Sequence, residues 1–248
     1  MGRPLALDLF CCAGGSAVGL ERAGFDVIGV DHKPSQHWSA SGSVVRADLS
    51  TPEDILGVLR AYRPAFVSAS PPCQRFSQGT PKKNRKGHPD LIGPTRVALA
   101  QYCKATGAGA WIENVPGAPL EAPIRLCGVM FPETQRVKRH RLFELIGWWT
   151  LEPAHTNCVK MANGERRPVI CCVRGATCDR GAGNGRDRER REAARRAGIK
   201  GQNRPGPGCV RWRRAMGWMD GPKDAYSLSQ AIPPAYAEWL GRRFLETR

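Results

Sequence analysis

The residue best placed to act as a nucleophile is Cys73, which directly follows the pair Pro71-Pro72. The short apolar run 65–70 precedes these prolines, so the sequence predicts a thiol at the end of a buried strand. Because proline restricts the backbone, this arrangement holds a thiol in a crevice, which a cysteine packed in a core does not require. The thiolate is the reactive form, so nearby arginines or a bound substrate must favour it.

A carboxyl group and two guanidinium groups follow the nucleophile along the chain. Glu113 ends the apolar run 109–113, where partial desolvation should raise its pKa and let it share a proton with a ring nitrogen. The alternating run 136–143 predicts one strand with Arg139 and Arg141 on one face and His140 on the other. Two guanidinium groups on one face suit a carbonyl oxygen plus a phosphate.

A second group of residues suits an adenosyl ligand. The turn Gly14-Gly15 follows the apolar run 5–10, and Asp31 ends the run 26–31, where a carboxylate can bind a ribose diol. The dinucleotide pattern G-x-G-x-x-G is absent, which favours an adenosyl ligand without phosphates. The ring of Phe10 could face a cationic centre such as a sulfonium, and Asp48 could accept from an adenine amino group. Alternatively, Phe10 is an aromatic residue of the core and Asp48 caps a helix or turn.

Alternating strands and helices must position these side chains. Helices are predicted from Ser16 to Ala23 and, after the cap at Thr51, to Tyr62. Strands are predicted at 5–10, 26–31, 65–70 and 109–113. This order predicts an open, mostly parallel α/β sheet whose ligand crevice runs along the carboxyl edge of the strands.

The charge of the chain is concentrated in one segment. The 248 residues carry a formal charge of +16, and residues 155–214 alone hold 16 Lys and Arg against five Asp and Glu. Gly- and Pro-rich stretches at 181–185 and 205–208 flank an arginine run, as at the boundaries of an inserted module. The run is either a solvated helix or a surface that tracks phosphates, and we favour the second interpretation, with contacts from Arg186, Arg188, Arg190, Arg191 and Arg195.

Other classes of protein fit the sequence less well. No apolar run is long enough to span a bilayer, so we expect neither a membrane protein nor a membrane partner. Ten cysteines in a chain of this length and apolar content are expected to be reduced thiols in a cytoplasmic setting. Six potential metal ligands lie in the basic segment, but their spacing is not that of a standard zinc finger (His155, Cys158, Cys171, Cys172, Cys178 and Cys209). We therefore expect ordinary packed thiols at these cysteines instead of structural zinc, for which the weak candidate ligands are His155, Cys158, Cys171 and Cys178.

Five motifs, in this order, resemble those of the C5-cytosine DNA methyltransferases. They are the segments 8–15 (DLFCCAGG), 71–77 (PPCQRFS), 113–115 (ENV), 139–141 (RHR) and 230–234 (QAIPP). The likeness covers roughly 1–150 and 209–248, and the basic segment falls where that family inserts its target-recognition region. The resemblance implies a small enzyme of the bacterial or phage type, such as those of restriction-modification systems. We expect it to be a monomer in the bacterial or phage-infected cell.

The resemblance also implies a fold, a cofactor and residue roles. The fold is a Rossmann-like S-adenosylmethionine-dependent methyltransferase sheet in a catalytic domain at 1–150, a small, basic, irregular target-recognition region at 151–208 and a completing segment at 209–248. S-adenosyl-L-methionine, which leaves as S-adenosyl-L-homocysteine, would contact Phe10, Cys12, Gly14, Gly15, Asp31, His32, Asp48, Leu49, Pro72, Gln230, Ala231 and Ile232.

For the reaction itself, the resemblance implies that Cys73 adds to C6 of a cytosine flipped out of double-stranded DNA. Glu113 would hold N3, Arg141 would contact O2, and Arg139 would brace the catalytic loop or a phosphate. Further DNA contacts are implied at Gln74, Arg75 and Ser77.

The motifs depart from the family pattern at three positions. Cys12 stands where a glycine is usual, Val137 where a glutamine is usual, and Gln230 where an asparagine is usual. Three alternatives remain: the transfer-RNA-modifying branch of the family, a catalytically silent DNA-binding relative, and a thymidylate-synthase-type enzyme. The last lacks the first and third motifs, and the intact Cys73, Glu113 and Arg141 argue against the second.

Overall fold

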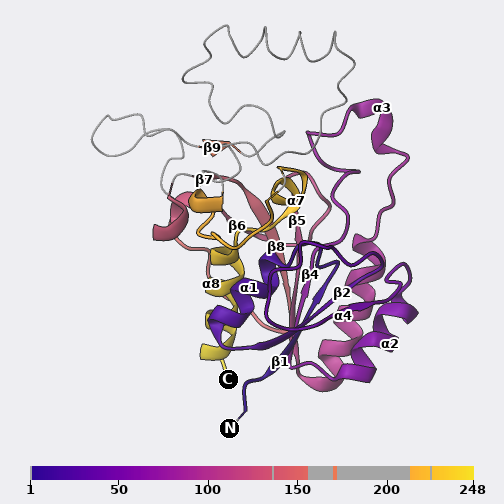
Figure 1. The fold of residues 1–248 in the computed structure, drawn as a ribbon. Coiled ribbons are helices and arrows are strands. Elements are labelled where there is room, and N and C mark those ends of the chain that lie inside the picture. The colour runs from indigo at the N-terminus through magenta and orange to yellow at the C-terminus, as the bar shows by residue number, and fades with distance from the viewer. Residues whose placement is uncertain (1, 136, 156–169, 172–212, 224) are drawn as a thin grey trace, which may run out of the picture.

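The computed structural model describes residues 2–135, 137–155, 170–171, 213–223 and 225–248. At its centre lies a seven-stranded sheet in the order β3-β2-β1-β4-β5-β8-β6. Figure 1 shows this sheet with helices beside it. The first five strands in this spatial order, β3 to β5, are parallel to one another, and β8 runs antiparallel to both of its neighbours. The strands are β1 (Leu5–Leu9), β2 (Asp26–Asp31), β3 (Val44–Arg46), β4 (Phe66–Ala69), β5 (Gly109–Asn114), β6 (Ile124–Leu126) and β8 (Arg141–Ile146).

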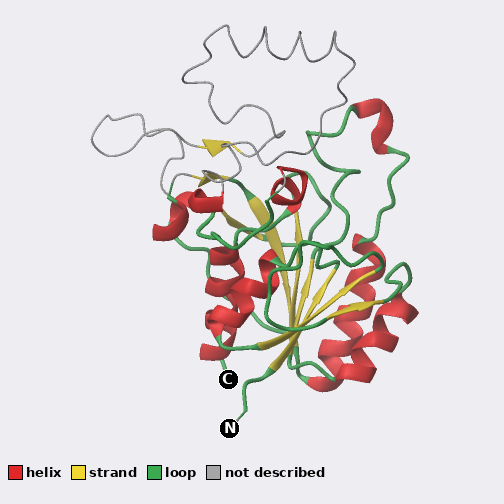
Figure 2. Ribbon diagram, in the orientation of Figure 1, coloured by secondary structure: helices red, strands yellow, loops and turns green. Residues whose placement is uncertain are grey.

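Helices cover both faces of this sheet (Figure 2). On one face, α1 (Gly15–Ala23) and α8 (Pro234–Glu246) pack on alternate strand residues such as Ala6 and Phe66. On the other face, α2 (Pro52–Tyr62) and α4 (Ile92–Thr106) pack on the intervening residues, such as Leu7 and Val67. Burial on both faces explains why the central strands are nearly continuous apolar runs.

The local signals in the sequence correspond closely to these elements. The strand predicted at 26–31 is β2, and the helix predicted after Thr51 is α2, which begins with a capping box between Thr51 and Asp54. The predicted α/β sheet with a parallel core is confirmed. Shorter elements are α3 (Lys82–Arg85), η1 (Gly128–Met130), η2 (Pro132–Thr134) and α7 (Ala225–Gln230).

The single strand predicted at 136–143 was wrong. The structure divides this region into β7 (Val137–Lys138) and β8, and β7 pairs instead with β9 (Ile170–Cys171) in a separate two-stranded sheet. Tertiary contacts provide the reason. The carbonyl of Arg139 accepts a 2.6 Å hydrogen bond from the Tyr236 hydroxyl on α8, and its guanidinium group donates to Ser229 O on α7. These bonds from the C-terminal helices hold the backbone out of the strand ladder.

Most of the predicted target-recognition region lies outside the described residues, as do Arg186, Arg188, Arg190, Arg191 and Arg195. Of the helices in the described part, none has the length and apolar character needed to cross a bilayer.

Candidate active site

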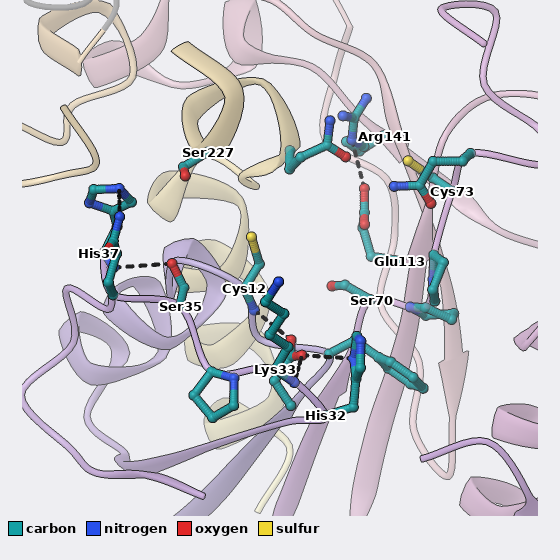
Figure 3. A pocket seen from close by; sticks show the side chains of 18 of the residues that line it. Cys12, His32, Lys33, Ser35, His37, Ser70, Cys73, Glu113, Arg141 and Ser227 are labelled. Atoms are coloured by element: carbon teal, nitrogen blue, oxygen red, sulfur yellow. Dashed lines mark hydrogen bonds and ion pairs between the residues drawn. The ribbon is translucent and has the colours of Figure 1, made fainter. Parts of the chain in front are cut away.

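A cavity of about 940 Å³ opens at the carboxyl ends of the parallel strands. It lies beside β1, where the order of the strands reverses between β2 and β4, the usual place for a ligand in such sheets. Figure 3 shows Cys73, Glu113 and Arg141 grouped at one part of the cavity and His32 and Lys33 at another. The sequence therefore correctly predicted a crevice along this edge.

The acid and the arginine come from neighbouring antiparallel strands. Glu113 lies near the end of β5, opposite Phe143 of β8, and Arg141 begins β8. Arg141 Nε lies 2.7 Å from Glu113 Oε1, and both side chains are largely buried, with 13% and 8% of their surface exposed. Burial raises the pKa of Glu113, against the opposing effect of Arg141 and Arg139. The predicted rise in the pKa of this carboxyl is confirmed.

Cys73 lies in the loop that follows β4 and lines the same cavity. The side-chain amide of Asn114 donates to Pro71 O at 3.0 Å, which ties this loop to the end of β5. Burial, and then the charge of Glu113, raises the pKa of the Cys73 thiol, while Arg141 and Arg139 act in the opposite direction without outweighing them. The nearby arginines alone therefore do not produce a thiolate, and the thiol remains protonated near neutral pH.

The other part of the cavity presents a fixed carboxylate. Asp31 Oδ2 accepts from Cys12 N at 3.1 Å, Asp31 Oδ1 accepts from Lys33 N at 3.0 Å, and His32 Nδ1 lies 3.1 Å from Oδ1. Two backbone donors thus orient the carboxylate, and its remaining lone pairs can accept from the hydroxyls of a ligand. Phe10, Pro72 and Gln230 also line the cavity.

The turn between β1 and α1 is unusually constrained. Phe10 and Cys12 have φ values of 56° and 46°, in the left-handed region that glycine occupies more readily. Gly14 follows with a φ of 85°. Cys12 thus has a conformation that favours glycine, the residue usual at this position in the motif that it resembles, and its N–H bond to Asp31 helps to hold it there.

The predicted cofactor contacts divide into two sets. Those that line the cavity are Phe10, Cys12, Asp31, His32, Pro72 and Gln230. The remainder are Gly14, Gly15, Asp48, Leu49, Ala231 and Ile232. Leu49, Ala231 and Ile232 are buried, and Asp48 is exposed and accepts from both the N–H and the hydroxyl of Ser50. A Cβ at Gly15 would lie 2.2 Å from Ile232 O, so this glycine allows the C-terminal segment to approach α1.

Ser70 and Pro71, from the predicted nucleophile segment, also line the cavity. Several other cavity residues were not predicted from the sequence, namely Lys33, Pro34, Ser35, Gln36, His37, Lys223 and Ser227. The segment 33–37 directly follows Asp31, and that proximity was the available signal. Lys223 and Ser227 reach the cavity from far along the chain, so no local pattern could place them there.

The predicted DNA contacts lie on the loop after Cys73. Gln74 lines the cavity, the guanidinium group of Arg75 donates to His88 O at 3.2 Å, and Ser77 Oγ accepts from Gly79 N. Arg139 is buried, and its guanidinium group donates to Ser229 O on α7. Among the predicted metal ligands, Cys158 and Cys178 lie outside the described residues.

The chain is similar to known proteins in sequence and in fold. No family model matches the chain. The Type II methyltransferase M.HgiGI of Herpetosiphon aurantiacus is 27% identical over 122 residues, which are 46% of this chain and 92% of that protein. The S. pombe Dnmt2 methyltransferase has a TM-score of 0.58 at 15% identity, with 99% of each chain covered. A putative DNA modification methyltransferase of an E. coli prophage has a TM-score of 0.52 at 14% identity, with 98% of this chain and 99% of that one covered.

These likenesses indicate a methyltransferase. At 14% to 15% identity the two solved structures establish the fold, which is the Rossmann-like α/β fold of S-adenosylmethionine-dependent methyltransferases predicted from the motifs.

Proposed function

We propose that this methyltransferase acts on C5 of cytosine in DNA through a covalent bond between Cys73 and the base. The observation that carries the proposal is the convergence of Cys73, Glu113 and Arg141 in one cavity that also holds the fixed Asp31 carboxylate. A nucleophile, a proton-holding acid and a cation are the three groups that addition to a pyrimidine ring requires.

The cavity fits S-adenosylmethionine. Asp31 offers carboxylate lone pairs for the ribose hydroxyls, and Phe10 offers an aromatic ring to a cationic sulfur. Cys12, His32, Pro72 and Gln230 complete the predicted contacts that line this space. When bound, the cofactor supplies an electrophilic methyl group.

Cys73, Glu113 and Arg141 lie at the part of the cavity away from Asp31, and each has a different role in the proposed reaction of the base. As Cys73 Sγ loses its proton to solvent and adds to C6, the ring electrons move toward N3, which takes the proton held by Glu113. Arg141, beside Glu113, donates to O2 and stabilises the charge that reaches the ring. C5 would then take the methyl group as the bond from that methyl to the cofactor sulfur breaks, which would leave S-adenosyl-L-homocysteine. Loss of the C5 proton to solvent allows the C5–C6 double bond to reform as Cys73 leaves, and N3 returns its proton to Glu113.

The charge of the chain favours a polyanionic partner, and DNA is the polyanion that we propose. The net charge is +16, and the loop after Cys73 carries exposed lysines on α3, at the same end of the molecule as the carboxyl ends of the strands (Figure 1). Phosphates along a DNA backbone are the natural partners of such a surface. Because the ring atoms are out of reach inside a duplex, the proposal requires the cytosine to be flipped out.

The proposal is tested by trapping the covalent bond between Cys73 and the base. DNA that contains 5-fluorocytosine should trap the wild-type protein in a complex that survives denaturation, because the fluorine cannot leave as a proton does. Cys73→Ser should abolish both this complex and methyl transfer. The matched control Cys103→Ser, at a buried thiol of α4, should retain both. A trapped complex that persists in Cys73→Ser would refute the nucleophile assignment.

The nature of the substrate is tested with labelled S-adenosylmethionine on DNA and on transfer RNA. Label in the C5 position of DNA cytosine is the expected result, and bisulfite-type sequencing would then identify the target site. Transfer to RNA alone would assign the chain to the transfer-RNA-modifying branch. DNA binding without transfer to either substrate would indicate the catalytically silent alternative.

A further inference from the structure

Three metal-binding side chains meet outside the active site. Cys127 directly follows β6, His140 lies between β7 and β8, and His155 follows β8. The ligand atoms of the three side chains all lie within 4.8 Å of one another. Cys127 is completely buried, and the two histidines are half-buried, with ring centroids 5.4 Å apart. The predicted ligand set shared only His155 with this cluster.

We propose that Cys127, His140 and His155 form a structural zinc site. One thiolate and two imidazoles are donors that zinc prefers. Tetrahedral zinc with ordinary bond lengths holds such donors about 3.4–3.6 Å apart, so the three side chains need to close by only about 1 Å. Cys127 Sγ now lies 3.9 Å from Val137 O, at the outer limit of a weak S–H bond, and on binding it would release its proton to solvent.

The charges around the cluster permit a divalent cation. Lys138 and Arg125 are the nearby cations, but Glu152 accepts from Arg125 N at 2.8 Å and lies 3.9 Å from its guanidinium group. The thiolate of Cys127 would remove one further unit of positive charge. Solvent would occupy the fourth position of the metal.

The position of the cluster gives the metal a structural consequence. His140 lies between Arg139, which bonds to α7, and Arg141, which pairs with Glu113. A metal on His140 would therefore hold the short segment that orients both arginines. By binding His155, the metal would also fix the position of the chain after β8, where the basic segment begins. These three residues would act as positioning residues, without contact to the substrate.

The test uses the full chain and needs no turnover. Purified protein stripped with a chelator should bind one Co²⁺ per chain, with the intense visible bands of tetrahedral cobalt and a thiolate-to-cobalt band in the near ultraviolet. Cys127→Ser should lose the thiolate band. His140→Gln should bind at least about 100-fold more weakly, since loss of even an outer-shell partner costs 10–100-fold. Cys103→Ser, the matched thiol control, should match the wild type.

Zinc should also raise the melting temperature of the wild type by about 10 °C when its concentration is about 1,000 times the dissociation constant. His140→Gln should lose most of that increase, which keeps the test informative if Cys127→Ser fails to fold. Unchanged metal binding in both variants, or cobalt without a thiolate band in the wild type, would overturn the proposal. Because metal content and spectra are measured without DNA, these results are independent of the proposed methyl transfer.

Discussion

Asp8 provides the sharpest quantitative prediction. It lies in β1, only 1% exposed, and its Oδ1 accepts a 2.9 Å hydrogen bond from the Ser68 hydroxyl on β4. Burial raises the pKa of Asp8 from 3.8 to about 8, although the Ser68 bond acts in the opposite direction. The folded protein therefore keeps the Asp8 proton in a pH range where the unfolded chain has lost it.

The sign and size of the effect follow from proton linkage. Between the two pKa values the folded state binds one more proton than the unfolded state, so the free energy of unfolding falls as the pH rises. With a folded pKa of about 8, the contribution of Asp8 should decrease by about 2 kcal/mol between pH 6 and pH 8. Asp8→Asn cannot ionise and should lack this decrease.

Urea unfolding of wild type and Asp8→Asn across this pH range measures the effect. The difference in unfolding free energy between the two proteins should change by about 2 kcal/mol in favour of the variant. Asp48→Asn is the matched control. Hydrogen bonds from Ser50 lower the pKa of that exposed carboxyl, so it stays ionised in both states over this range and should add no pH dependence. Parallel curves for wild type and Asp8→Asn would show that Asp8 is ionised in the folded state and refute the reasoning.

Two further predictions concern packing and DNA binding. Gly15→Ala should destabilise the protein by about 2 kcal/mol in urea unfolding, because the added Cβ would lie 2.2 Å from Ile232 O. Gly57→Ala, in open space on α2, should instead stabilise it by about 0.5–1 kcal/mol, and equal destabilisation of both variants would contradict the close-approach argument. The triple replacement of three exposed lysines by glutamine, two on α3 and one directly after it (Lys82, Lys83 and Lys86), should reduce the slope of log affinity for DNA against log salt by about 0.9 for each phosphate that these lysines neutralise in the wild type. Lys104→Gln on α4 should leave the slope unchanged, and a slope unaltered by the triple change would remove this segment from the DNA-binding surface.

The main residues of the candidate site were predictable because each has a local signal. Cys73 follows two prolines after a buried strand, and Glu113 and Asp31 end apolar runs. Parallel strands bring their carboxyl ends to one edge, so the order of the elements also predicted that these side chains would face a common crevice. Burial of β5 on both faces then accounts for the raised pKa of Glu113.

The region from 137 to 155 was less predictable because its conformation depends on partners far along the chain. Alternation predicted one strand, but bonds from Tyr236 and to Ser229 divide it, and Arg141, at the start of β8, pairs with Glu113. The same tertiary contacts place His140 beside Cys127 and His155, a cluster that no spacing in the sequence indicates.

The sequence by itself determined the α/β sheet, the candidate nucleophile with its candidate acid and the carboxylate at the end of the second strand, since each depends on periodicity and neighbouring residues. Only the tertiary structure decided that Arg141 lies beside Glu113, that burial raises the pKa of the Cys73 thiol, and that Gly15 faces Ile232. Ionisation and close approach depend on what surrounds a group in space, and those surroundings come from segments more than 200 residues apart in the case of Gly15 and Ile232.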